Sequence, residues 1–241
     1  MKKILLILLL LTSSVSALAR NFCNVPENLD IPKVQDVDNK KEGPIDSYVL
    51  AISWSPQFCS TSAGKSDESK FQCKLNKFGF VVHGLWGQND NAKDDLKDHP
   101  RHCNPSKSGD AIVVDSKIIE QNICTMPSTK LIQGEWQKHG TCTSMSQVNY
   151  FGKINELYNS LYMPDMANIV NEKNETTVLS IVSQILLLNR EKNIPSDSIV
   201  IRTGKNNVLN EIFICYDTNF NFKACKSKGA PLMNKIVIKP R

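Results

Sequence analysis

Runs of apolar residues separated by polar stretches divide this chain into a short series of expected elements. The run from Tyr48 to Trp54 predicts a buried strand that ends at Ser55-Pro56, and residues 78–83 predict a second strand. Further strands are predicted near the C-terminus, at 199–201, 208–215 and 235–238.

Apolar residues also recur at helical spacing. One stripe is formed by Phe151, Ile154, Leu157, Tyr158 and Leu161. The predicted helices cover residues 115–124, 129–139, 150–162 and 177–189. Ser128 follows a proline and is suited to cap the second of them. Because strands and helices do not alternate regularly, we expect a single α+β domain with a largely antiparallel β-sheet packed by several α-helices.

Three polar stretches interrupt this pattern. Residues 20–46 carry prolines and predict an extended N-terminal arm, so the folded domain is expected to span 47–241. Residues 59–73 are rich in Ser, Gly and Lys and predict a hairpin-like excursion. Residues 87–110 predict a long surface loop, and loops of that length inside a domain are usually functional.

The first residues have the pattern of a targeting segment. Met1-Lys2-Lys3 is basic, residues 4–11 are apolar, and Ala17-Leu18-Ala19 has the small-x-small form of a cleavage site. The apolar run is too short to span a bilayer. We therefore predict a signal peptide at 1–19 and an exported protein, periplasmic or extracellular, without a membrane segment after cleavage.

Eight cysteines follow the predicted signal peptide, and an even number in an exported chain predicts disulfides without fixing their pairing. No CxxC pair is present, which argues against a zinc knuckle or a thioredoxin-like redox centre. The formal net charge is +5, of which Lys2 and Lys3 contribute two. This mildly basic balance is compatible with a polyanionic partner.

The predicted helix at 129–139 carries the most distinctive chemistry. Glu135, Lys138 and His139 stand at i, i+3 and i+4, so their side chains share one face. Together they offer a polarising anion, a fixed positive charge and a proton acceptor. Trp136 points elsewhere and can anchor the helix in a core, while Gly140 suits the helix end. The same pattern is also typical of a solvated amphipathic helix with one ion pair.

A second candidate segment is His83-Gly84-Leu85-Trp86, where we place His83 at the end of a strand. An isolated histidine there is more often structural. Together with His139 on a helix, it suits a pair in which one imidazole acts as general acid and the other as general base. Trp86 offers a flat face for a nucleobase, or packs in the core.

These two segments, 82–86 and 135–142, resemble the active-site segments of the ribonuclease T2 family. Residues 54–59, 126–128 and 214–217 are similar to other segments of that family, so the resemblance covers about 47–226. It implies a ribonuclease T2-like fold stapled by disulfides. It also implies an RNA substrate, no cofactor and no metal; we expect a monomer without an obligate protein partner.

The resemblance implies an endoribonuclease that cleaves single-stranded RNA by transphosphorylation. A 2′,3′-cyclic phosphate forms and is then hydrolysed toward a 3′-phosphate. By resemblance His139 is the base, His83 the acid, and Lys138 stabilises charge on the phosphoryl oxygens. Glu135 orients its neighbours or holds a proton at the phosphate. Trp86 and Gln88 are the expected contacts to a base, whose identity the sequence does not give.

The resemblance also implies the disulfides Cys59–Cys73, Cys103–Cys142 and Cys215–Cys225, which leaves Cys23 with Cys124. One departure concerns Gly134, because many family members have a phosphate-contacting histidine there. A bridge at Cys103 would bring His102 close to the catalytic helix, so His102 or His99 is a candidate for the missing contact. The alternative is an ordinary histidine of a surface loop.

Two other functions remain open. A metal-dependent hydrolase would use His83, His99, His102 and Asp98, but their spacing matches no known ligand pattern. A non-catalytic, secreted RNA-binding or toxin-like relative would share the scaffold. The presence of both His83 and His139 favours the enzyme.

Overall fold

The structure is a computed structural model, and it describes residues 23–30, 33–34, 40–92, 98–104 and 112–241. The predicted signal peptide, parts of the N-terminal arm and parts of the loop at 87–110 lie outside the described residues.

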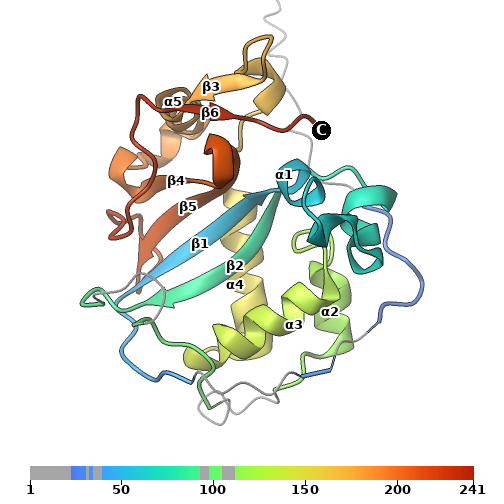
Figure 1. The fold of residues 1–241 in the computed structure, drawn as a ribbon. Coiled ribbons are helices and arrows are strands. Elements are labelled where there is room, and N and C mark those ends of the chain that lie inside the picture. Colours follow the sequence, from blue (N-terminus) through green and yellow to red (C-terminus); the bar gives the residue numbers. More distant parts are fainter. Residues whose placement is uncertain (1–22, 31–32, 35–39, 93–97, 105–111) are drawn as a thin grey trace, which may run out of the picture.

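A four-stranded antiparallel sheet forms the centre of the molecule (Figure 1). Its strands lie in the order β2-β1-β5-β4. Their bounds are Ser47–Trp54 for β1, Phe80–Gln88 for β2, Ile199–Thr203 for β4 and Leu209–Asp217 for β5. The strand predicted at 78–83 therefore continues to Gln88, and the prediction that His83 ends it is wrong. The antiparallel sheet itself is confirmed.

The helices predicted from periodicity are present with small shifts in their bounds. They are α2 at Ser116–Asn122, α3 at Thr129–Lys138, α4 at Gln147–Ser160 and α5 at Val178–Leu188. Ser128 caps α3 as predicted, since its side chain accepts a hydrogen bond from the Leu131 amide. In Figure 1, α4 lies across β1 and β2, with α2 and α3 beside it.

Two regions differ from the prediction. The segment between Cys59 and Cys73 is not a hairpin, because α1 (Ser55–Cys59) leads into short helical turns at 63–65, 67–69 and 71–75. Pro56 suits the first turn of α1, and the Ser66 and Ser69 hydroxyls donate hydrogen bonds to the Ala63 carbonyl. The predicted strand at 235–238 forms as β6 (Lys235–Val237). It pairs with β3 (Glu175–Thr177) in a separate sheet instead of joining the central one.

The two faces of the central sheet have different roles. Leu50 and Ile52 of β1 point into the main core with the apolar sides of α2 to α5. The neighbouring residues of β1 point to the other face, because successive side chains of a strand alternate. A smaller buried cluster forms there from Val49, Ala51, Phe213 and Cys215. Trp86 packs partly buried against that cluster. The second face therefore keeps an accessible surface on a rigid support.

Strand β2 is an edge strand, and its outer edge is covered by hydrogen bonds from other elements. The Tyr150 and Tyr158 hydroxyls of α4 donate to the Leu85 and Phe80 carbonyls at 2.8 and 2.7 Å. The Val82 amide donates to the Thr125 carbonyl at 2.9 Å. These contacts fix β2, and with it His83, relative to the helices.

All four predicted disulfides are present: Cys23–Cys124, Cys59–Cys73, Cys103–Cys142 and Cys215–Cys225. The Cys103–Cys142 bridge fastens the loop before α2 to the turn after α3. Within the described part of the chain, no helix has the length and apolar character to cross a membrane.

Candidate active site

His83 lies at a bulge in β2. Gly84 pairs with Ala51 and Val82 pairs with Ile52, so His83 has no partner residue in β1. Because of this extra residue, Val82 and Leu85 both point into the main core, although they are three positions apart. His83 and Trp86 are left on the opposite face. The bulge thus aims the imidazole at the accessible side of the sheet.

The His83 imidazole lies between two carboxylates. Nδ1 is 2.6 Å from Oε1 of Glu211, and Nε2 is 3.6 Å from Oε1 of Glu135. Burial lowers the pKa of His83, but the hydrogen bond to Glu211 and the charges of Glu135 and Glu211 outweigh it, so the net pKa is raised. His83 is therefore inclined to hold a proton.

Glu135 is buried, with a side chain that is 7% exposed. Its Oε2 accepts a hydrogen bond of 2.7 Å from the Trp86 indole. Gly84 makes this approach possible, because a Cβ there would overlap both the Glu135 carboxylate and the indole nitrogen. Burial raises the pKa of Glu135. The charge of His83, the hydrogen bond from Trp86 and the charge of Lys138 each lower it, but the net pKa is raised. Glycine and tryptophan of the segment 83–86 thus position Glu135.

Trp86 contacts both histidines. Its ring stacks on the His139 ring, with centroids 5.4 Å apart and an interplanar angle of 28°, and meets the His83 ring edge-on at 5.1 Å. Phe213 of β5 packs edge-on against the same indole at 5.3 Å. One face of Trp86 is thus occupied by His139, which the sequence did not predict. Base stacking on Trp86 stays a prediction.

His139 follows the last residue of α3 and is only 8% exposed. Its Nδ1 is buried and has no hydrogen-bond partner among the described residues. Burial lowers the pKa of His139 well below its usual value, and the charge of Lys138 lowers it further, followed by smaller effects of the other histidines. His139 is therefore neutral under conditions where His83 is protonated.

Both histidines and Trp86 line one cavity of about 260 Å³, whereas Glu135 lies outside its wall. Its wall includes His83, Trp86, Lys138, His139, Gln88 and Glu211. Three more cationic residues, Arg101, Arg202 and Lys226, line the same cavity. The two imidazoles therefore reach a shared space with several positive charges, which suits an anionic substrate. The side-chain amide of Gln88 donates to the Trp86 and Gly87 carbonyls at 3.3 and 3.2 Å.

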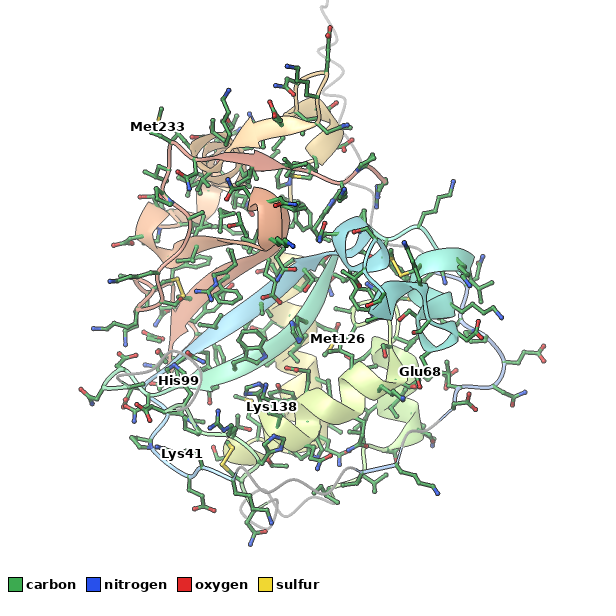
Figure 2. All side chains as sticks on the ribbon, viewed as in Figure 1. Lys41, Glu68, His99, Met126, Lys138 and Met233 are labelled. Atoms are coloured by element: carbon green, nitrogen blue, oxygen red, sulfur yellow. A yellow bond between two sulfur atoms is a disulfide. The ribbon has the colours of Figure 1, made fainter. Side chains whose placement is uncertain are left out.

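The two loop histidines have different positions. His99 lines the cavity, and its Nδ1 accepts a hydrogen bond of 3.1 Å from the Asn89 amide. His102 is not part of the cavity wall; its backbone amide donates to the Lys138 carbonyl at 2.8 Å. Figure 2 labels His99, which comes from the loop after β2, and Lys138, which comes from the end of α3; both line this cavity. His99 is thus the better placed of the two to contact a ligand.

Gly134 lies on an exposed part of α3. No atom would lie within 4 Å of a Cβ at this position. Position 134 therefore has room for a larger side chain, and it is not part of the cavity wall. Among the described residues, no group of three or more His, Cys, Asp or Glu side chains is arranged to hold a metal ion.

Glu211 was not predicted from the sequence as a site residue. This residue lies on β5, on the same face as Phe213 and Cys215, and it lines the cavity beside His83. A signal was present, because Glu211 is the one charged residue in the otherwise apolar or uncharged run from 208 to 216. Its partner was not predictable, since β2 and β5 are far apart in sequence.

Comparisons with known proteins agree with this architecture. The family model described as the Ribonuclease T2 family matches residues 45–225. A probable ribonuclease of Haemophilus influenzae is 35% identical over 208 residues, covering 83% of this chain and 69% of that protein. A ribonuclease of Aeromonas hydrophila is 33% identical over 116 residues, covering 48% of this chain and 46% of that protein.

Solved structures show the same fold. An RNase-related protein from Calystegia sepium superposes with a TM-score of 0.61 at 21% identity, over 82% of this chain and 97% of that one. Trichomaglin, described as an S-like ribonuclease, also gives 0.61 at 18% identity, over 82% of this chain and all of that one. The ribonuclease T2-like α+β fold is thus confirmed.

Proposed function

This chain belongs to the Ribonuclease T2 family, and on that premise we propose that it is an exported, metal-independent endoribonuclease acting on single-stranded RNA. It cleaves by transphosphorylation through 2′,3′-cyclic phosphates toward 3′-phosphate ends. The observation that carries this proposal is the pair of histidines on one cavity with opposite pKa shifts.

The opposite shifts support the assignment of the base and the acid. A base must be neutral before it acts, and burial beside Lys138 lowers the pKa of His139. An acid must be protonated, and the two carboxylates around His83 raise its pKa despite burial. His139 therefore takes the proton of the ribose 2′-hydroxyl. His83 gives a proton from Nε2 to the 5′-oxygen that leaves.

The reaction needs no external nucleophile in its first step, because the attacking 2′-oxygen is already tethered to the phosphate. The bond from phosphorus to the 2′-oxygen forms while the bond to the 5′-oxygen breaks. Lys138 lies on the cavity wall, where its charge stabilises the phosphoryl oxygens as they become more negative. Glu135, whose pKa is raised by burial, orients Trp86 and His83 or holds a proton at the phosphate.

In the second step water replaces the leaving nucleoside. His83, now neutral, takes a proton from that water, and the protonated His139 returns its proton to the 2′-oxygen. The cyclic phosphate opens to a 3′-phosphate, and both imidazoles regain their starting protonation. Trp86 and Gln88 are the proposed contacts to a base.

Digestion of homopolymeric and mixed RNA in excess EDTA, with analysis of the product ends, tests this function. We expect undiminished cleavage and cyclic phosphates among the early products, and the cut sites give the base preference. Loss of cleavage in EDTA would favour the metal-dependent hydrolase. Binding of RNA without cleavage would favour the non-catalytic relative. The protein is expected to elute as a monomer in the same buffer.

Export is part of the proposal and rests on the predicted signal peptide together with four disulfides. Fractionation of expressing cells tests it. We expect the protein in the periplasm or the medium, with an N-terminus at residue 20. A chain retained in the cytoplasm with residues 1–19 intact would contradict it.

A further inference from the structure

We propose that Glu211 of β5 is a positioning residue for the acid: it holds the His83 imidazole in the one tautomer that leaves Nε2 free to deliver and recover a proton. This inference rests on the proposed function, because it concerns the same reaction. It adds a residue that the resemblance to the family does not assign.

The sheet fixes Glu211 relative to His83. Strand β1 lies between β2 and β5, and Ser53 of β1 pairs in register with Glu211. The Glu211 carboxylate reaches across β1 to His83, where Oε1 lies 2.6 Å from Nδ1. The Ser53 hydroxyl donates to the same oxygen at 3.3 Å. With a side chain only 13% exposed, Glu211 has little freedom to move away from the imidazole.

This contact decides which nitrogen of His83 keeps its proton. An ionised carboxylate can only accept hydrogen bonds, so Nδ1 must carry a hydrogen toward Glu211. The proton that leaves is therefore the one on Nε2, the nitrogen on the side of Glu135. After transfer, His83 keeps Nδ1–H and presents a lone pair on Nε2. The neutral imidazole is then ready to act as base in the hydrolysis step, as in other His–carboxylate pairs.

Glu211 also determines how the charges around His83 balance. The charged groups that face the ring are Glu211 from β5 and Glu135 and Lys138 from α3. Burial and Lys138 lower the pKa of His83, whereas the two glutamates raise it. Without the Glu211 charge only Glu135 opposes burial, so the pKa of His83 falls. Among the described residues, the charged groups that act on His139 are Lys138 and the other three histidines, and all of them lower its pKa.

A purely structural role explains Glu211 poorly. A carboxylate that is nearly buried on a sheet face next to Phe213 is costly unless it is paired. The bond from Ser53 is long, and His83 supplies the short contact. The pair is therefore mutual: Glu211 needs the imidazole as a donor, and His83 needs Glu211 to hold its tautomer.

Glu211→Gln tests the proposal, with kcat and KM measured as functions of pH. A neutral amide removes the negative charge and can donate a hydrogen to Nδ1, which favours the wrong tautomer. We expect kcat to fall about 10- to 100-fold, less than the ~10²- to 10⁴-fold that the acid itself contributes, with KM little changed. The basic limb of the kcat profile should move to lower pH by about one unit, because His83 with a lower pKa loses its proton at lower pH and can then no longer act as the acid. Glu211→Asp keeps the negative charge, so it should retain part of the parent's kcat and part of the parent's position of the basic limb.

Two controls accompany this variant. Glu156→Gln on α4 removes an exposed carboxylate that pairs only with Lys153 among the contacts described, so its profile should match the parent. Ser53→Ala removes the second hydrogen bond to Glu211 and leaves its charge, so the basic limb should move much less. A Glu211→Gln profile that falls uniformly without any shift of its basic limb would overturn the positioning role.

A second readout does not depend on catalysis. The chain has four histidines, so their ring protons can be titrated individually by NMR. In Glu211→Gln we expect the pKa of His83 to fall, while His99, His102 and His139 change little. An unchanged His83 titration would overturn the inference even if activity falls. If the parent fails to cleave RNA, the proposed function fails, and this titration still decides whether Glu211 controls His83. Should Glu211→Gln not fold, Glu211→Asp tests the contact instead: its shorter side chain draws the carboxylate away from Nδ1, so the pKa of His83 should still fall, by less, and an unchanged His83 titration would overturn the inference.

Discussion

His83 and His139 reach one cavity and pack against one tryptophan, yet their surroundings are opposite in charge. His83 comes from a strand and lies between Glu211 and Glu135. His139 comes from the end of a helix, is nearly buried, and is affected mainly by Lys138 and the other histidines. The difference teaches that two identical imidazoles acquire different proton occupancies from their neighbours alone.

The two histidines also differ in how they are held. His83 is fixed at a bulge in the sheet and by a 2.6 Å contact to Glu211. His139 is held by packing: its ring stacks on Trp86, and the helix end that carries it is tied to a loop through Cys103–Cys142. Changes at the sheet should therefore alter first how the acid is held, and changes at the helix end how the base is held.

Replacing each histidine by phenylalanine gives the largest expected effect. The aromatic ring preserves packing on Trp86 but has no nitrogen, so each variant should lose about 10²- to 10⁴-fold in kcat. A substrate with a nitrophenolate leaving group separates the roles, because that oxygen needs no proton. We expect this substrate to restore much of the activity of His83→Phe and none of His139→Phe. Rescue of His139→Phe instead would reverse the assignment.

Lys138 is expected to have the next largest effect. Lys138→Ala removes a charge at the phosphate, which should lower kcat by about 10²-fold or more. It also removes the main charge that lowers the pKa of His139. That pKa should rise, so the acidic limb of the pH profile should move to higher pH, since the base must be neutral. Lys130→Ala on the same helix is the control, because Lys130 is exposed and pairs with Glu68. An acidic limb that stays in place would contradict the role of Lys138.

The sequence predicted the chemistry of this site better than its geometry. His83 and His139 were identified from short runs of residues, and both line the cavity. The bulge at His83 was not predictable, because it arises from register with β1 and not from any property of residues 78–83. For the same reason the strand was predicted to end at His83, whereas pairing with β1 continues to Gln88.

Burial explains the remaining differences. Glu135 and His139 were predicted to share one helix face, with no indication of how deeply they lie; both are buried, and Trp86 packs against them. Glu211 was missed because its role depends on a contact between strands 128 positions apart. Helix α3 itself was predictable, since Ser128 and the apolar residues at its core face are local signals.

The two loop histidines provide a finer test of the cationic side of the site. His99→Ala should raise KM several-fold, because His99 lines the same cavity as Lys138 and an imidazole there adds a polar group to the cationic wall. His102→Ala is the matched control and should leave KM unchanged, since His102 lies outside the cavity wall. Equal effects of the two changes would remove His99 from the phosphate site.

Substitutions of Gly134 and Gly140 by alanine are expected to have the smallest effects on catalysis but measurable effects on the free energy of unfolding. Gly140→Ala would push its Cβ into the buried Trp136 ring, so we expect a loss of about 1–3 kcal/mol in the free energy of unfolding. The Cβ of Gly134→Ala would have no atom within 4 Å, because this helix position is exposed. The substitution should therefore raise the free energy of unfolding by about 0.5–1 kcal/mol.

Chemical denaturation measures both changes, and kcat measured at the same time relates them to the site. Gly140→Ala should lower kcat modestly, because the shifted Trp136 moves the helix end that carries His139. Gly134→Ala should leave kcat unchanged. The basic limb of the pH profile, which reports His83, should stay in place in both variants, since neither change alters the two carboxylates beside the His83 imidazole. A shift of that limb in Gly140→Ala would mean that the acid and the base are not held independently.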